Sequence, residues 1–161
     1  MIDNLDQRLI LELQQSGRRS YVELANVLGI SEGTVRKRIK NLIAKDVLEI
    51  TATPNLDKLG FDFVGVVGLQ VRLADLKSVA LKLAEYPNVC YLANVTGQYE
   101  FIAIIAAKSS KEYADFVETV ISTIPSIVKS ETFVVLNIFK GKRLGLDTAQ
   151  LTSNLNDYLS S

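Results

Sequence analysis

Residues 20–42 read SYVELANVLGISEGTVRKRIKNL, and this stretch carries the strongest structural signal in the chain. Its apolar residues recur at steps of three and four, the period of an amphipathic α-helix, with one interruption at Gly29. Ser20 and Glu23 have the spacing of a capping box, and Ser31 can cap a second helix. Two short helices around a four-residue turn are typical of a helix-turn-helix, whose second helix enters the major groove of DNA.

The second helix of this pair concentrates the charge of the chain. Between Ser31 and Lys45 there are five basic residues and one acid, which leaves a net charge of −4 on the rest of a chain that is neutral overall. On a helical wheel the apolar positions face inward and the cations face outward or flank the outer face. Long cations reach phosphates, whereas Thr34 and Asn41 can contact base edges. We predict the following DNA-contacting residues: Ser31, Gly33, Thr34, Arg36, Lys37, Arg38, Lys40 and Asn41.

A basic face on an exposed helix can also be no more than a solvated face. The helix-turn-helix spacing around it favours DNA binding over that alternative. Upstream, Asp3 can cap a further helix whose apolar stripe is Ile2, Leu5, Leu9 and Leu13. Downstream, residues 47–54 are rich in β-branched side chains and end at a proline, which predicts an extended wing or a hinge. We therefore assign residues 1–50 to a winged helix-turn-helix domain and residues 51–61 to a wing or hinge linker.

From Phe63 the hydrophobic period becomes two, which is typical of β-strands. The pattern predicts strands over 63–73, 89–95, 99–107 and 127–139, and helices over 75–86 and from Ser109 or Ser110 to about residue 123. This βαββαβ order is that of the ferredoxin-like fold, so the overall class is α+β. The second domain spans 62–141, and a polar tail over 142–161 follows, in which Leu151, Leu155 and Leu159 can line a short helix.

Both faces of the predicted sheet are largely apolar. In the first strand Val67, Leu69 and Val71 alternate with Val64 and Val66. The two helices of a βαββαβ unit cover only one face, and the other would be a larger apolar patch than a monomer in water normally exposes. A homodimer that pairs sheet to sheet hides this face. Alternatively, the tail or the first domain folds back over it.

The composition excludes several classes of function. The chain of 161 residues has no histidine and a single cysteine, Cys90, which removes Ser-His-Asp and Cys-His catalysis, zinc sites with histidine and internal disulfides. Neither a phosphate loop nor a pair of carboxylates at catalytic spacing is present, so we predict neither an enzyme nor a cofactor or metal. The sequence also lacks a run of 18 apolar residues, and acids stand near its start. We therefore expect a cytoplasmic protein without a membrane partner.

Several motifs together resemble the Lrp/AsnC family, the bacterial and archaeal feast/famine regulators. They read DxxLI at 6–10, LAxxLGISxxTVxxRIxxL at 24–42, VLEI at 47–50, LG at 59–60 and TGxY at 96–99. The resemblance implies a winged helix-turn-helix joined to an effector-binding domain, dimers that pair through their sheets, octamers or other rings of dimers, and amino acids as effectors. Two residues depart from the family pattern, because Asp46 stands where glycine is usual and Glu100 where aspartate is usual.

The turn at residues 96–100 is the candidate effector site. Gly97 permits a positive φ and exposes backbone amides that can receive a carboxylate, while Glu100 can receive an ammonium group. The predicted effector residues in this turn are Thr96, Gly97, Gln98, Tyr99 and Glu100. The resemblance adds Ser130 and Thr132 from the last strand. A plain hairpin with a solvent-facing glutamate is the alternative.

These observations favour a sequence-specific DNA-binding regulator of transcription, modulated by an amino acid or a related molecule at an oligomer interface. The competing interpretation is an amino-acid-sensing oligomer that acts through protein partners without binding DNA.

Overall fold

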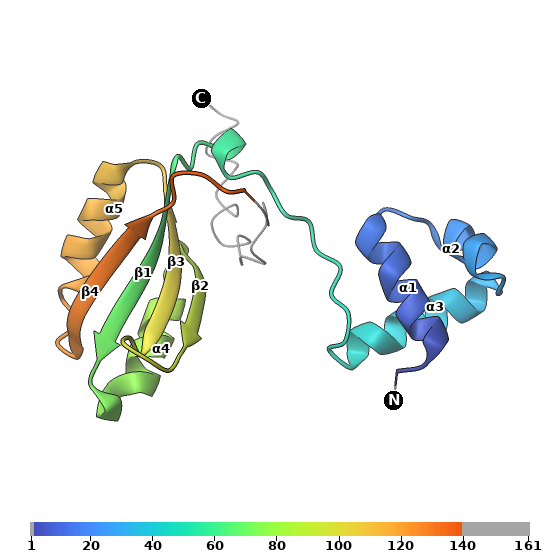
Figure 1. The fold of residues 1–161 in the computed structure, drawn as a ribbon, viewed down its shortest axis with the longest axis horizontal. Helices are drawn as coiled ribbons and strands as arrows, with labels where there is room; N and C mark the ends of the chain where they lie inside the picture. Colours follow the sequence, from blue (N-terminus) through green and yellow to red (C-terminus); the bar gives the residue numbers. More distant parts are fainter. Residues whose placement is uncertain (1, 140–161) are drawn as a thin grey trace. The chain divides into compact units, whose positions relative to one another are not determined.

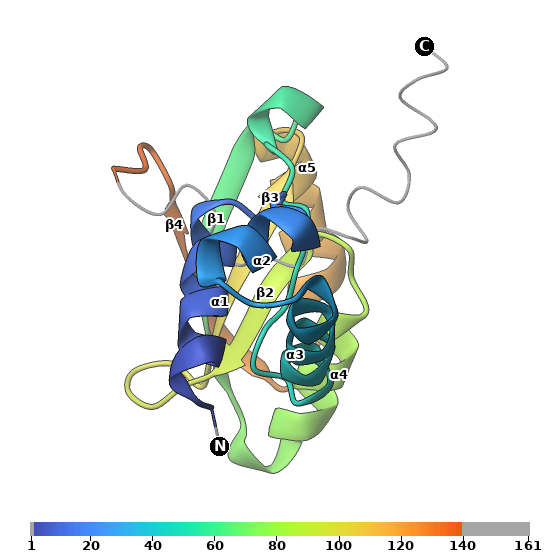
Figure 2. The ribbon, with the colours of Figure 1, turned by 90° about the vertical axis from the view of Figure 1, so that its right-hand side faces the viewer.

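The structure of the protein is a computed structural model that describes residues 2–139, and the chain divides into two compact units at Ala52 and Thr53. The predicted tail over 142–161 lies outside the described residues. In the first unit, the helices are α1 (Asn4–Gln15), α2 (Tyr21–Leu28) and α3 (Glu32–Ala44), which Figures 1 and 2 show from two sides. Leu9, Leu24 and Val35 are fully buried where the three helices meet, so one small core holds this unit together.

The helix caps follow the sequence. Asp3 forms a capping box with Asp6 at the start of α1, and Ser20 forms one with Glu23 at the start of α2. The hydroxyl of Ser31 accepts from the backbone N–H of Thr34 at 3.2 Å. Three of the predicted caps are thus confirmed, and each satisfies an amide that the helix leaves unpaired.

The end of α3 explains how the chain accommodates Asp46. The Asp46 N–H donates to the Ile43 carbonyl at 3.0 Å, and the Val47 N–H donates to the Leu42 carbonyl at 2.9 Å. This pair of bonds is a Schellman motif, which places one residue in the left-handed region. Asp46 adopts a φ of +54° there, so the turn keeps its glycine-like geometry with a side chain that tolerates it better than most.

The segment that follows was predicted to be either a wing or a hinge. The residues from Val47 to Asn55 form neither helix nor strand, so this described segment is an extended connection and not a β-wing. Leu48 packs partly against the first core. The second unit begins with a short 3₁₀ helix, η1 (Asp57–Leu59). This helix and Phe61 pack against Cys90 and Ala106 of the same unit.

The second unit is an antiparallel four-stranded sheet in the order β2-β3-β1-β4. Its strands are β1 (Phe63–Val71), β2 (Val89–Asn94), β3 (Phe101–Ala107) and β4 (Ile127–Val134). Its helices are the 3₁₀ helix η2 (Leu73–Asp75), α4 (Leu76–Ala84), α5 (Ser110–Phe116) and the π-helical turn η3 (Val117–Ile121) that continues α5. The predicted βαββαβ order is confirmed.

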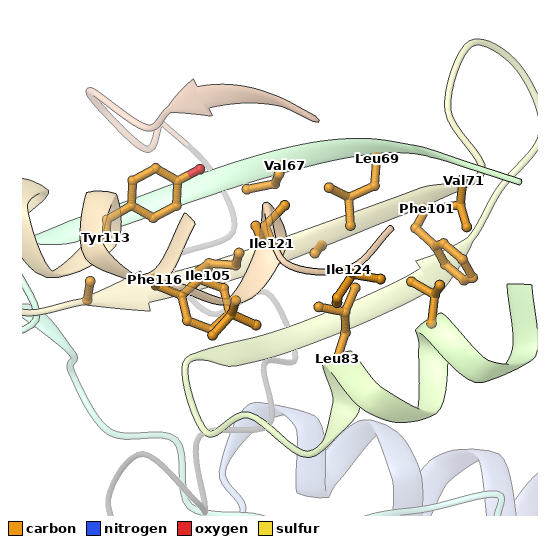
Figure 3. Close-up of a cluster of buried hydrophobic side chains, with 14 residues drawn as sticks. Val67, Leu69, Val71, Leu83, Phe101, Ile105, Tyr113, Phe116, Ile121 and Ile124 are labelled. Carbon is orange, nitrogen blue, oxygen red and sulfur yellow. The ribbon is translucent and has the colours of Figure 1, made fainter. Parts of the chain in front are cut away.

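The core of this unit lies between one face of the sheet and the helices α4 and α5 (Figure 3). Val67 and Leu69 from β1 meet Leu83 from α4 and Phe116 from α5. Among the described residues, η1 and Phe61 cover one end of the opposite face, and the ring of Tyr99 lies over Gly68 on the same face. Figure 1 shows that α4 and α5 both lie behind the sheet.

The last strand is shorter than predicted. It ends at Val134, and Val135 makes one more bond, to the carbonyl of Val64 at 3.0 Å. Strand β1 begins at Phe63, so the chain beyond Val135 has no strand to pair with. Similarly, β3 begins at Phe101 and not at Tyr99, because the loop between β2 and β3 occupies residues 95–100. Within residues 2–139, no helix is long and apolar enough to cross a bilayer.

Candidate nucleic-acid interface and effector turn

The outward face of α3 borders a concavity of about 710 Å³ in the first unit. Its lining is mostly polar and comes mostly from α3. The lining residues are Ile2, Asp3, Asp6, Ser31, Gly33, Thr34, Lys37, Arg38, Asn41, Leu42, Lys45 and Val47. Six of the eight predicted DNA-contacting residues therefore meet at one hollow, and Arg36 and Lys40 lie outside it.

The lysines of this helix are free to bind a ligand. Lys37, Lys40 and Lys45 are exposed, and within the described residues none of their ammonium groups forms an ion pair or a hydrogen bond. The amide of Asn41 is exposed and likewise without a partner in the described part of the chain. Free cations beside a free amide can contact phosphates and a base edge at the same time.

Arg36 is held by neighbours on two helices. Its Nη2 lies 2.7 Å from Oε1 of Glu32, one turn earlier on α3, and its guanidinium lies 5.3 Å from the ring centre of Tyr21 on α2. Because both contacts are exposed, each contributes little to stability. They hold the guanidinium at the start of the two helices, where it still faces solvent.

Arg38 is tied to α1. Its Nη1 donates to Oδ2 of Asp3 at 2.7 Å and to Oδ1 of Asp6 at 2.8 Å. These bonds, first to Asp6 and then to Asp3, raise the pKa of Arg38. The pKa of Asp3 is lowered, chiefly by the backbone N–H of Asp6 and next by Arg38. The structure thus places Arg38 in an internal ion pair at the edge of the concavity.

The start of α3 has small and polar residues facing out. The hydroxyls of Ser31 and Thr34 lie 2.8 Å apart and share a hydrogen bond. A Cβ built on Gly33 would meet no atom within 4 Å, so this position is open to a partner. A phosphate is favoured at such a helix N-terminus because the first amides point outward.

In the second unit, the loop between β2 and β3 carries five of the predicted effector residues. Gly97 adopts a φ of +128°, as its glycine identity allows, while Thr96 and Gln98 are exposed. The Gln98 carbonyl accepts from Nε2 of Gln70 at 2.9 Å. The loop is therefore anchored to β1 through its backbone.

Tyr99 fixes the loop onto the open face of the sheet. Its ring lies against Gly68, where an added Cβ would come within 2.7 Å of the ring. Its hydroxyl donates to the carboxylate of Glu131 on β4, which raises the pKa of Tyr99 and lowers the pKa of Glu131. The Nζ of Lys129 also lies 3.4 Å from Oε2 of Glu131.

Glu100 has a structural partner inside the protomer. Its Oε2 accepts from the backbone N–H of Val71 at 2.8 Å. The pairing of β1 with β3 ends at Leu69 and Phe101, so the carboxylate satisfies an amide of β1 just beyond the end of that pairing. Its second oxygen makes no hydrogen bond within the described residues.

The structure does not bring Ser130 and Thr132 to this loop within one protomer. They pair with Leu69 and Val67, whose side chains face the helices, whereas Glu131 between them faces the open side with Tyr99. The hydroxyl of Thr132 bonds that of Tyr113 on α5. Ser130 lines a separate groove of about 200 Å³ beside η3.

Sequence reasoning missed two residues at these sites. Lys45 lies in the concavity although it caps the end of α3, and a wheel extended by one residue would have included it. Glu131 meets Tyr99 only because β4 pairs with β1, and that pairing has no local signal in the sequence.

Comparison with known proteins assigns both units. An AsnC-type helix-turn-helix domain matches residues 2–43, and an Lrp/AsnC ligand-binding domain matches residues 64–144. The chain belongs to the Lrp/AsnC family. As an Lrp/AsnC protein it is a DNA-binding regulator of transcription modulated by a small molecule, and it is not an enzyme.

The relatives of this Lrp/AsnC protein match along nearly their whole length. The regulator LrpA of Pyrococcus abyssi is 34% identical over 141 residues, which cover 87% of this chain and 100% of LrpA. An HTH-type transcriptional regulator of Pyrococcus furiosus is also 34% identical over 141 residues, covering 87% of this chain and 95% of that one. These matches confirm the resemblance found in the sequence.

Solved structures agree with the fold. E. coli AsnC is similar with a TM-score of 0.80 at 26% identity, over 87% of this chain and 95% of AsnC. A regulator of Neisseria meningitidis, solved as a complex with L-Met, has a TM-score of 0.80 at 19% identity, over 87% of this chain and 93% of that one. The latter likeness shows the fold alone.

Proposed function

We propose that α3 contacts the major groove of duplex DNA through the concavity that Lys37, Asn41 and Lys45 line, with Lys40 beside it on the same helix. The single observation that carries this proposal is that these cations and the amide have no partner within the described residues. Lys37, Lys40 and Lys45 neutralise phosphates, and Asn41 and Thr34 contact base edges. Arg36, whose guanidinium faces solvent at the start of the helix, reaches a flanking phosphate.

Salt dependence tests this proposal. Each neutralised phosphate releases counterions, so the logarithm of the binding constant falls with the logarithm of salt by about 0.9 per phosphate. A gel shift at low salt with genomic fragments supplies the duplex, and fluorescence anisotropy of a retained fragment gives the slope. Absence of retention at low salt would reject direct DNA binding and favour the interpretation in which the oligomer senses amino acids and acts through protein partners.

We infer that two protomers pair through the open face of the sheet. Val66 and Ile102 are half-buried there, and Tyr91 and Phe133 are 44% and 50% exposed in the single chain. Strand pairing places these four side chains on one face. Val66 pairs with Phe133 on β4 and with Ile104 on β3, and Ile104 pairs with Tyr91 on β2. Ile102 lies two residues before Ile104 on β3, so its side chain is on the same face. A contiguous apolar face of this kind is typical of an interface. In this proposal, such dimers join into higher assemblies such as octamers. The regulator acts in the cytoplasm.

We also propose that an amino acid binds at the loop over residues 95–100 where protomers meet. The exposed amides around Gly97 suit a carboxylate, and the free oxygen of Glu100 suits an ammonium group. The regulator of Neisseria meningitidis that shares this fold was solved with L-Met, an amino acid. Because Ser130 and Thr132 face the helices in one protomer, their part in the site requires the second protomer.

A thermal-shift screen of the twenty amino acids tests the effector proposal. Ligand binding to the native state raises its stability by mass action, so one compound at 100 times its Kd contributes about 2.7 kcal/mol. Light scattering in parallel reports the assembly. The expected outcome is one class of amino acid that raises the melting temperature in the native protein and less in the Glu100→Ala variant. Equal shifts for both proteins would place the ligand elsewhere.

A further inference from the structure

The side chains of Asp3, Asp6 and Arg38 form a closed network between the start of α1 and the middle of α3. Asp3 uses one oxygen to accept from the Asp6 N–H at 2.9 Å and the other to accept from Arg38 at 2.7 Å. Asp6 accepts from Arg38 with one oxygen and from the Asp3 N–H, at 3.2 Å, with the other. All four carboxylate oxygens are therefore occupied.

From this network we propose that Arg38 is a positioning residue, which fixes α3 against α1, and that it does not neutralise a DNA phosphate. The inference rests on the DNA-binding function proposed above. It separates Arg38 from Lys37, its neighbour in sequence, which shares the concavity but has no partner within the described residues.

The charges of the network support this assignment. Two carboxylates surround one guanidinium, so the group carries a net charge of −1 and offers a phosphate no net attraction. Both Nη1–H donors of Arg38 are used, and Asp6 is 14% exposed, so releasing the guanidinium would leave a mostly buried carboxylate without its cation. Hydrogen bonds between an ionised donor and an ionised acceptor, such as these two, are stronger than bonds between neutral groups.

The placement of the network supports a role in positioning. The bonds join residues that are 35 and 32 positions apart in sequence, and Asp3 is also the cap of α1. On α3, Arg38 lies between Lys37 and the buried Ile39, one turn before Asn41 and Leu42. Holding Arg38 therefore fixes the rotation of α3 about its axis, and this rotation decides whether Lys37 and Asn41 reach the groove together.

The test compares Arg38→Gln with Lys37→Gln in the full chain, by fluorescence anisotropy of a labelled duplex between 50 and 300 mM salt. We expect Lys37→Gln to reduce the salt slope by about 0.9, because one phosphate is no longer neutralised. We expect Arg38→Gln to weaken binding by the same factor, roughly tenfold, at every salt concentration, so that the salt slope stays that of the wild type. A slope reduction in Arg38→Gln equal to that of Lys37→Gln would overturn the proposal.

A charge swap keeps the proposal testable if Arg38→Gln does not fold. Arg38→Glu is expected to lose DNA binding, and Asp6→Arg combined with Arg38→Glu is expected to restore it to within about threefold, because the ion pair returns with reversed sense. If Arg38 contacts a phosphate, the glutamate repels DNA and the double variant stays inactive although circular dichroism shows it folded, which contradicts the proposal.

The two proposals fail in different ways. If the wild-type chain does not bind duplex, the DNA-binding function fails, and the network is then judged from thermal unfolding of the wild type, the two single variants and the double variant. Shifts in melting temperature that do not add between Asp6→Arg and Arg38→Glu support the network. Additive shifts overturn it.

Discussion

The two candidate binding regions of this protein differ in how far their polar groups are already satisfied. On α3, Lys37, Lys40, Asn41 and Lys45 have no partner within the described residues. In the loop over residues 95–100, by contrast, backbone or side-chain groups of Gln98, Tyr99 and Glu100 bond to β1 or β4.

This difference matches the ligands proposed for each region. A DNA duplex brings a dense array of charge, so its site works best with cations that give up no internal bond on binding. A small amino acid must instead be selected, and a loop held by defined bonds presents its amides in one geometry. In the proposed effector site, a second protomer supplies the remaining polar groups.

Reversing two of the free charges should have the largest effect on the first region. Lys37→Glu with Lys40→Glu replaces attraction to phosphates with repulsion, and we expect a loss of roughly 100-fold or more in duplex affinity near 100 mM salt. Anisotropy measures the affinity, and light scattering should show an unchanged oligomer.

The matched control reverses two exposed lysines of α4, Lys77→Glu with Lys82→Glu, which makes the same change in net charge. If this control loses as much affinity as the α3 variant, the loss reflects total charge and the assignment of α3 is wrong.

A charge on the open face of the sheet should have the next largest effect. The proposed effector site at the loop over residues 95–100 needs the dimer that this face is proposed to form. Phe133→Asp puts a charge in the middle of the proposed contact, and burying an unpaired carboxylate is strongly unfavourable. We expect at least a tenfold increase in the protein concentration needed for dimers, measured by multi-angle light scattering. Leu81→Asp, at a similarly exposed position on α4, should leave the mass unchanged. A dimer that persists equally in both variants would place the interface elsewhere.

A substitution at Gly68 tests how Tyr99 anchors the loop over residues 95–100. In Gly68→Ala the new Cβ would lie 2.7 Å from the Tyr99 ring, so the ring must move off β1 and away from Glu131. We expect a loss of about 1–3 kcal/mol in the free energy of unfolding, the usual range for overpacking. Urea denaturation measures it. Gly33→Ala is the comparison, since nothing lies within 4 Å of the added Cβ, and a larger loss there than at Gly68 would contradict this description of the loop.

The smallest effect concerns the end of α3. Asp46 holds a left-handed φ of +54°, and glycine adopts this region without a Cβ clash. Asp46→Gly should therefore raise the free energy of unfolding by about 0.5 kcal/mol, and Asp46→Ala should lower it by a similar amount. Thermal unfolding of both variants checks the sign, and a gain in the alanine variant would argue against a left-handed residue here.

Local signals predicted the parts of the molecule that depend on neighbours in sequence. The cap at Asp3, the capping box at Ser20 and the βαββαβ order all follow from short-range patterns, and the structure confirms them. For residues 47–54 the sequence left a wing or a hinge open, and the structure has an extended connection, because β-branched residues favour a strand only where a partner strand is available.

Contacts between distant residues had no such signal. A helical wheel places Arg38 on the flank of a basic face, but it does not show that Asp3 and Asp6 reach it from 35 and 32 residues away. Likewise, the family resemblance implied Ser130 and Thr132 near the loop, whereas within one protomer the register of β4 on β1 turns them to the helix side and brings Glu131 to Tyr99. Tertiary pairing decides these positions.

Lysine modification mapped by mass spectrometry tests the central claim most directly. The protein is dimethylated with and without a duplex that it retains, and the modified fraction of each lysine is compared. We predict strong protection of Lys37, Lys40 and Lys45 by DNA and unchanged modification of Lys77 and Lys82. Equal modification of Lys37 with and without bound duplex would contradict the assignment of α3 as the DNA-contacting helix.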